Sequence, residues 1–121
     1  LSFAAARYST LDLMSPEERR EIYSKMVHES GRAAAEIGYW FLDRKHAARV
    51  DASKIAVPVL VVAGSRDRIT PATVCRKVAQ RYPGFSTYKE YPDHAHWVVG
   101  EPGWSEIARD IEHWLKASLH E

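Results

Sequence analysis

The chain has 121 residues, of which 45% are hydrophobic and 27% are charged, and its formal net charge at pH 7 is +1. This length allows one domain, and the composition is that of a globular protein, which excludes a disordered chain. Because the 17 basic and 16 acidic residues nearly balance, the composition gives no sign of a nucleic acid or membrane surface as a partner.

Cys75 is the single cysteine, so no internal disulfide can form, and a reducing, cytoplasmic location is expected. No apolar run approaches the ~18 residues that cross a membrane. The N-terminal stretch LSFAAARYST has no apolar core long enough for a signal peptide. The sequence does not begin with methionine, so we expect a processed protein or a piece of a longer one.

Two helices are predicted within residues 1–54. The first begins at Ser15, where Ser15, Pro16 and Glu18 match a capping box with proline at the first helical position. The second begins near Ser30. Its apolar positions follow a helical spacing and are Ala33, Ile37, Trp40 and Phe41.

From residue 55 onward the pattern predicts a strand, a helix, a second strand and a closing helix. The strands are IAVPVLVVAG and STYKEY, and the first is a continuous β-branched run typical of a strand buried on both faces. Between the two strands, Thr70 as the cap and Pro71 at the first helical position predict the start of a helix. The closing helix has the strongest amphipathic pattern, with Trp104, Ile107, Ala108, Ile111, Trp114 and Leu115 on one side.

A strand–helix–strand order with short links predicts two parallel or near-parallel strands in one sheet. Two strands do not make an independently stable sheet, and a strand buried on both faces needs neighbours on both sides. We therefore expect another chain, or self-association, to complete the sheet.

Candidate catalytic residues follow the two predicted strands. Asp67 lies just past the first strand, and His94 and His96 lie just past the second. Parallel strands bring both loops to the same edge of the sheet. A carboxylate that binds one imidazole nitrogen fixes the tautomer and leaves the other nitrogen as a general base. The sequence therefore supplies two members of a nucleophile–His–acid triad.

These segments resemble a known family. VPVLVVAGSRDRITPA, followed by YPDHAHWVVGEPGW and an amphipathic helix, resembles the C-terminal half of the α/β-hydrolase fold, and GRAAAEIGYWFLDRK resembles its lid helices. The resemblance covers essentially the whole chain. It places Asp67 at the acid position and His96 at the histidine position, with Ala95 where glycine is usual.

The resemblance implies an α/β fold with a lid-like helical segment over residues 1–54 and a βαβα part of the hydrolase core over 55–121. It implies hydrolysis of an ester or related bond through an acyl-enzyme, with His96 as general base and acid and Asp67 as its orienting carboxylate. The implied partner is a small ester-like substrate, and no cofactor is implied.

The nucleophile of that family, in Gly-x-Ser-x-Gly, does not occur in this sequence, and Ser65 lies too close to Asp67 to replace it. We therefore expect a complementing N-terminal hydrolase segment to supply the nucleophile, and the isolated chain to be inactive. Relatives with an aspartate nucleophile that act on epoxides or carbon–halogen bonds fit this half equally well.

Three aromatic residues are candidates for an apolar substrate pocket. They are Trp40, Phe41 and Trp97. For Trp40 and Phe41, which cluster with Tyr39, packing in the core or in an interface is the alternative.

The histidine loop also allows a metal site, formed by Asp93, His94 and His96 with Asp67. His-x-His is a weak signal without a third well-placed ligand, so no metal is expected. We expect His94 to be a supporting or surface residue without a catalytic role.

A function of another class also fits: a non-catalytic α/β fragment that serves as an oligomerisation or binding module, with Asp67 and His96 as inherited remnants. In either case a free strand edge and surplus apolar helix surface favour a homo-oligomer or a complementing segment as partner.

Overall fold

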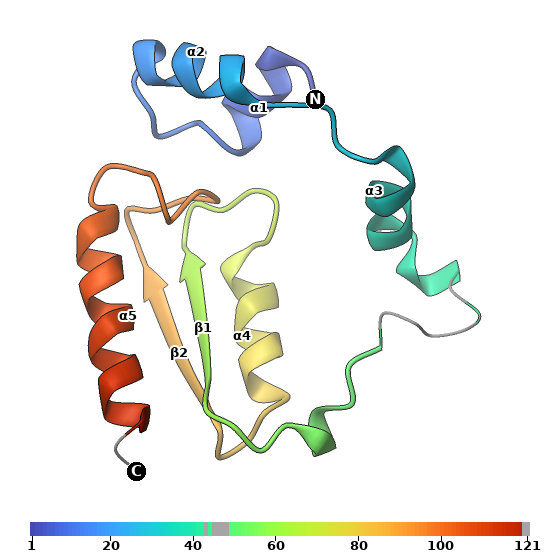
Figure 1. Cartoon of the computed structure of the whole chain (residues 1–121), viewed down its shortest axis with the longest axis vertical. Helices are drawn as coiled ribbons and strands as arrows, with labels where there is room; N and C mark the ends of the chain where they lie inside the picture. Colours follow the sequence, from blue (N-terminus) through green and yellow to red (C-terminus); the bar gives the residue numbers. More distant parts are fainter. Residues whose placement is uncertain (43, 45–48, 120–121) are drawn as a thin grey trace.

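The chain forms a helical N-terminal part followed by a small α/β part (Figure 1). The computed structural model describes residues 1–42, 44 and 49–119. Its elements are α1 (Phe3–Ser9), α2 (Pro16–Lys25), α3 (Gly31–Gly38), β1 (Val59–Gly64), α4 (Ala72–Gln80), β2 (Ser86–Tyr91) and α5 (Trp104–Leu119), with short 3-10 turns at Trp40–Leu42 and Ala52–Lys54. Asp43 and Lys45, at the end of the segment GRAAAEIGYWFLDRK that resembles lid helices, lie outside the described residues. No helix in the described ranges is long and apolar enough to cross a membrane.

β1 and β2 pair in parallel, with Val59 opposite Ser86 and Gly64 opposite Tyr91. This confirms the predicted βαβ unit, because a parallel pair needs a crossover, and α4 provides it. Both arrows in Figure 1 point towards α1 and α2, so the carboxyl ends of the strands lie on the side of the N-terminal helices.

α4 covers one face of this sheet. The Ser86 hydroxyl donates to the Ala79 carbonyl at 2.7 Å, and the Tyr88 hydroxyl lies 3.2 Å from the Ala72 carbonyl. Side chains two residues apart on a strand point to the same face, so both contacts belong to one side of β2.

α5 covers the opposite face, which the alternate residues of β2 form. Trp114 Nε1 donates to the Thr87 hydroxyl at 3.1 Å, and the Tyr91 hydroxyl donates to Asp110 Oδ2 at 2.7 Å. Ile107, one turn before Asp110, is buried. Trp104, Ala108 and Leu115 are exposed, so only part of the predicted apolar side of this helix is buried. A sheet of two strands is too narrow to cover the whole side.

β1 has only one neighbour within the described part of the chain, and its outer edge is open. Only Ala63 and Gly64 of the strand are buried, and Val59 to Val62 are partly exposed. The expectation of a strand buried on both faces was wrong for this chain alone, because its second neighbour is missing from the described residues.

The N-terminal helices enclose a small core of their own. Ser15 and Glu18 form the predicted capping box of α2. α1 was not predicted, because its Phe-Ala-Ala-Ala run shows no apolar periodicity, but the Ser2 hydroxyl caps it. The core consists of Ala6, Leu11 and Met14, with Ile22, Tyr23 and Trp97 packed against it. Trp97 belongs to the histidine loop, so its ring joins the two parts of the molecule.

α3 is shorter than predicted. The Ser30 hydroxyl caps its start as expected, but the helix ends at Gly38, a residue that weakens helices. Trp40 and Phe41 lie on a 3-10 turn instead of on the helix, and both are exposed. The predicted apolar stripe therefore does not form.

We predict that Ile107→Ala lowers the free energy of unfolding by about 2–4 kcal/mol, because a nearly buried side chain, 2% exposed, leaves a cavity between α5 and the sheet. Ile37→Ala is the matched control, because Ile37 is 77% exposed, and its effect stays within about 0.5 kcal/mol. Urea unfolding measures both. Equal effects of the two substitutions would contradict the packing described here.

Candidate active site

Asp67 and His96 meet at the carboxyl edge of the sheet. His96 Nδ1 lies 2.9 Å from Asp67 Oδ2. The two residues are 29 positions apart in the sequence, and the parallel pairing of β1 and β2 brings their loops together. The contact that the sequence predicts between these two side chains is present.

The turn after β1 fixes the Asp67 carboxylate. Asp67 Oδ1 accepts hydrogen bonds from the backbone N–H groups of Ile69 at 2.7 Å and Thr70 at 2.8 Å, which leaves Oδ2 for His96. The predicted cap at Thr70 was wrong: α4 begins at Ala72, after Pro71, and no side chain caps it. Of the expected cap, the Thr70 backbone N–H binds the Asp67 carboxylate instead.

These bonds keep Asp67 ionised. Burial is the largest single influence and raises its pKa, but the hydrogen bonds from Thr70, His96 and Ile69 together outweigh it, so the pKa lies below its ordinary value. An ionised carboxylate only accepts hydrogen bonds, so Nδ1 of a neutral His96 must carry the proton. Nε2 then has a free lone pair and is the basic nitrogen of the site.

Gly64 allows the two loops to touch. A Cβ atom at this position would lie 2.5 Å from the His94 carbonyl oxygen and closer still to that of Ala95. The Arg66 N–H also donates to the His94 carbonyl at 2.9 Å. The histidine loop therefore rests directly on the end of β1, and any side chain at Gly64 would push it away.

His94 is buried and faces other partners than His96 does. It is 8% exposed, so the surface alternative for this residue was wrong. Its Nδ1 lies 3.2 Å from Glu101 Oε2, without the geometry of a hydrogen bond, and its ring meets the edge of Tyr91. His94 therefore packs beneath the surface of the loop, beside Glu101 and Tyr91.

Sequence reasoning missed Glu101. Both of its carboxylate oxygens accept backbone N–H groups of the histidine loop, from Ala95 and from Trp97. The only available signal was an acidic residue five positions after His96, directly before Pro102 and the start of α5. Such a residue is not distinguishable from a surface acid until the path of the loop is known.

The three aromatic pocket candidates are not grouped. Trp97 packs against Gly100 and the N-terminal core, whereas Trp40 and Phe41 contact each other edge to face with ring centroids 6.4 Å apart. In Figure 1, α3 and the turn that follows it lie to one side of the sheet. A role of these residues in a substrate pocket stays a prediction.

The residues considered for a metal site have separate partners. Asp93 is exposed and lies 3.4 Å from Arg66, His94 faces Glu101, and His96 faces Asp67. Among the residues that the structure describes, no three His, Cys, Asp or Glu side chains are grouped for a metal ion.

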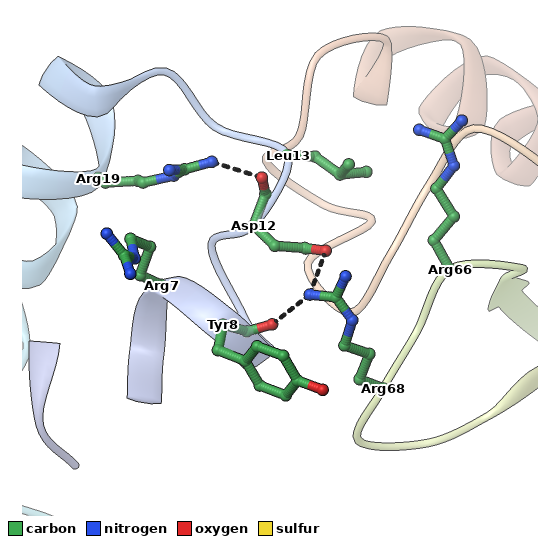
Figure 2. Close-up of a pocket in the computed structure, with 7 residues that line it drawn as sticks. All are labelled: Arg7, Tyr8, Asp12, Leu13, Arg19, Arg66 and Arg68. Atoms are coloured by element: carbon green, nitrogen blue, oxygen red, sulfur yellow. Dashed lines mark hydrogen bonds and ion pairs between the residues drawn. The ribbon is translucent and has the colours of Figure 1, made fainter. Parts of the chain in front are cut away.

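An arginine-rich cleft of about 670 Å³ lies between the N-terminal helices and the turn of Asp67 (Figure 2). Its lining residues are Arg7, Tyr8, Asp12, Leu13, Arg19, Arg66 and Arg68. Arg68 Nη1 donates to the Tyr8 carbonyl at 2.7 Å and lies 3.0 Å from Asp12 Oδ2. Its guanidinium also stacks over the Tyr8 ring at 4.6 Å. Arg68 follows Asp67 in sequence, so this cluster ties the acid-bearing turn to the N-terminal part.

Comparison with known families gives one match. A sequence model of the family described as serine aminopeptidase, S33, matches residues 7–103. The match extends from α1 through both strand ends and includes Asp67, His96 and Glu101. Searches of curated proteins and of solved structures gave no match.

We predict that Gly64→Ala lowers the free energy of unfolding by about 2 kcal/mol or more, because the new methyl group collides with backbone that cannot rotate away. Gly31→Ala is the control, since no atom lies within 4 Å of a Cβ at that position. Thermal unfolding of both variants measures the difference. A Gly64→Ala protein as stable as the Gly31→Ala protein would contradict the close approach of the loops.

We also predict an acid-dependent contribution from Asp67. Because its folded pKa is lowered, its stabilisation is complete above the unfolded value of about 4 and disappears as pH falls through the folded pKa. Asp67→Asn should therefore be less stable than wild type at pH 7, and the difference should narrow below about pH 4. Urea unfolding at a series of pH values tests this, and a pH-independent difference would contradict it.

Proposed function

The chain belongs to the serine aminopeptidase S33 family of the α/β-hydrolase superfamily, and we propose that it is the lid and C-terminal half of a hydrolase that cleaves an ester or related bond. The nucleophile comes from a segment outside this chain. The observation that carries the proposal is the 2.9 Å contact between His96 Nδ1 and Asp67 Oδ2 at the carboxyl edge of a parallel sheet.

The geometry supports a defined role for each of the two residues. Asp67 holds the imidazole with the proton on Nδ1, so Nε2 takes the proton of the nucleophile as its oxygen attacks the substrate carbonyl. Nε2 then gives that proton to the leaving group, and the cycle repeats with water to release the acyl group. The His96 side chain is 34% exposed, which leaves the ring accessible to a substrate.

The chain offers no nucleophile of the family's type. Gly-x-Ser-x-Gly is absent from the sequence, and the hydroxyl of Ser65, the serine nearest to Asp67 along the chain, donates to Glu90 Oε1 at 2.7 Å. This supports a nucleophile on another segment, which Asp67 and His96 would activate. A nucleophilic aspartate on that segment would direct the same pair to epoxides or carbon–halogen bonds.

The open edge of β1 supports a complementing N-terminal hydrolase segment as the partner. Unpaired strand edges and large apolar patches are normally covered in native proteins. Several large apolar residues of the α/β part are exposed: Val57, Ile69, Val74, Val78, Phe85, Trp104 and Leu115. Added strands and helices would cover this surface.

The same surface supports the second candidate function, a homo-oligomeric module without catalysis. In that case copies of the chain cover the edge of β1, and the Asp67–His96 pair has no nucleophile to serve. The mass of the native assembly and its reaction with a serine-directed phosphonate separate the two functions. A stable monomer with a two-stranded sheet would exclude both forms of assembly.

We predict no ester turnover by the isolated chain, and turnover when the chain is combined with a complementing N-terminal hydrolase segment. His96→Ala should lower kcat of that assembly by about 10³-fold or more, because the base is lost. His113→Ala, an exposed histidine on α5, is the control and should leave kcat unchanged.

Two outcomes would contradict this proposal. The first is ester turnover by the isolated chain that His96→Ala abolishes. The second is a complete assembly in which a fluorophosphonate labels no residue and His96→Ala changes no rate.

A further inference from the structure

Glu101 is the most deeply buried ionisable residue among those that the structure describes, with 1% of its surface exposed. Its Oε2 accepts the N–H of Ala95 and its Oε1 accepts the N–H of Trp97, both at 2.8 Å. These two amides belong to the residues immediately before and after His96. One carboxylate therefore holds the backbone on both sides of the candidate base.

A buried carboxylate is costly unless hydrogen bonds compensate it. Here two charge-assisted bonds to backbone amides do so, and each would leave a buried donor unsatisfied if the carboxylate were removed. His94 Nδ1, 3.2 Å from Oε2, adds a polar neighbour on the same side. The arrangement is consistent with an anion whose place is fixed by the loop it binds.

The His96 ring needs such support. About a third of its side chain is exposed, and its hydrogen bond within the described residues goes to Asp67 alone. One bond leaves a ring free to swing about its side-chain torsions and its own backbone. The direction of the imidazole must therefore come largely from the backbone that carries it.

The Glu101 side chain does not serve as a cap of α5. The first amide of that helix, Trp104 N–H, donates to the main-chain carbonyl of Glu101 at 2.9 Å, whereas the carboxylate bonds go to the loop. The Arg66 N–H binds the other side of the loop through the His94 carbonyl, and Gly64 leaves room for that carbonyl to approach. The loop is thus fixed by the turn after β1 and by Glu101, three residues before the start of α5.

We propose that Glu101 is a positioning residue that holds the His96 imidazole against Asp67 through the two flanking amides. The proposal rests on the proposed function for the role of the pair, but the geometry it describes is measurable in this chain without a substrate. Glu101 acts through the backbone and touches no reacting atom.

Glu101→Gln tests the proposal with little change in volume. Glutamine offers one acceptor oxygen, and its NH2 group would face one of the two backbone donors. Glu106→Gln is the matched control, because Glu106 is exposed in the first turn of α5. Asp67→Asn serves as the reference for a pair whose ionic partner is removed directly.

The readout is the tautomer of the His96 ring, from its 15N chemical shifts in the labelled 121-residue chain at neutral pH. In wild type and in Glu106→Gln, Nδ1 should carry the proton. In Glu101→Gln the Nδ1–H fraction should fall about twofold or more, towards the mixture of tautomers that a free imidazole adopts. A merely structural role of Glu101 would lower stability without changing this fraction.

The outcomes separate this proposal from the proposed function. A Glu101→Gln ring that keeps the wild-type tautomer, while Asp67→Asn changes it, overturns the role of Glu101 and leaves the pair intact. A tautomer unaffected by either substitution overturns both. A shifted tautomer in Glu101→Gln supports the positioning role even if the completed assembly hydrolyses no ester.

Amide exchange in the wild-type chain gives a second test that does not depend on the variant folding. The N–H groups of Ala95 and Trp97 should exchange roughly 100-fold or more slowly than that of Val99, which is exposed on the same loop. Exchange as fast as that of Val99 would mean that the carboxylate does not hold these amides, and would overturn the proposal.

Discussion

The close approach of the two strand-end loops over Gly64 is the constraint on which the rest of the site depends. Parallel pairing alone brings the loops to one edge, but the His94 and Ala95 carbonyls reach the end of β1 only because Gly64 has no side chain. That approach sets the distance over which Asp67 can bind the His96 ring. A bulkier residue at Gly64 would separate acid and base before any change in their own chemistry.

Two carboxylates then position one histidine, His96, through different contacts. Asp67 binds the ring itself and fixes which nitrogen carries the proton, whereas Glu101 binds the main chain on both sides of the ring. Both are shielded from solvent, and each has its oxygens satisfied by backbone amides or by the imidazole. Arg68 adds a link from the same turn to the N-terminal helices, so the site also depends on that part of the chain.

The sequence was sufficient to predict an element where a local pattern of residues determines its structure. STYKEY became β2 with the expected bounds, and the capping box placed the start of α2, because both depend on neighbouring residues. The Asp67–His96 contact followed from topology. The partners of buried polar groups were not predictable: the Thr70 amide serves Asp67 instead of a helix cap, and Glu101 reaches back to a loop. Whether such groups pair depends on the three-dimensional path of the chain.

In the proposed function, the outer edge of β1 and the free Nε2 of His96 are parts of one incomplete enzyme. A crystal structure of the chain together with a complementing N-terminal hydrolase segment tests this most directly. We predict a strand paired to the outer edge of β1 and a nucleophilic oxygen about 3 Å from His96 Nε2. An outer edge that pairs with a second copy of this chain, with no nucleophile within reach of Nε2, would contradict the account.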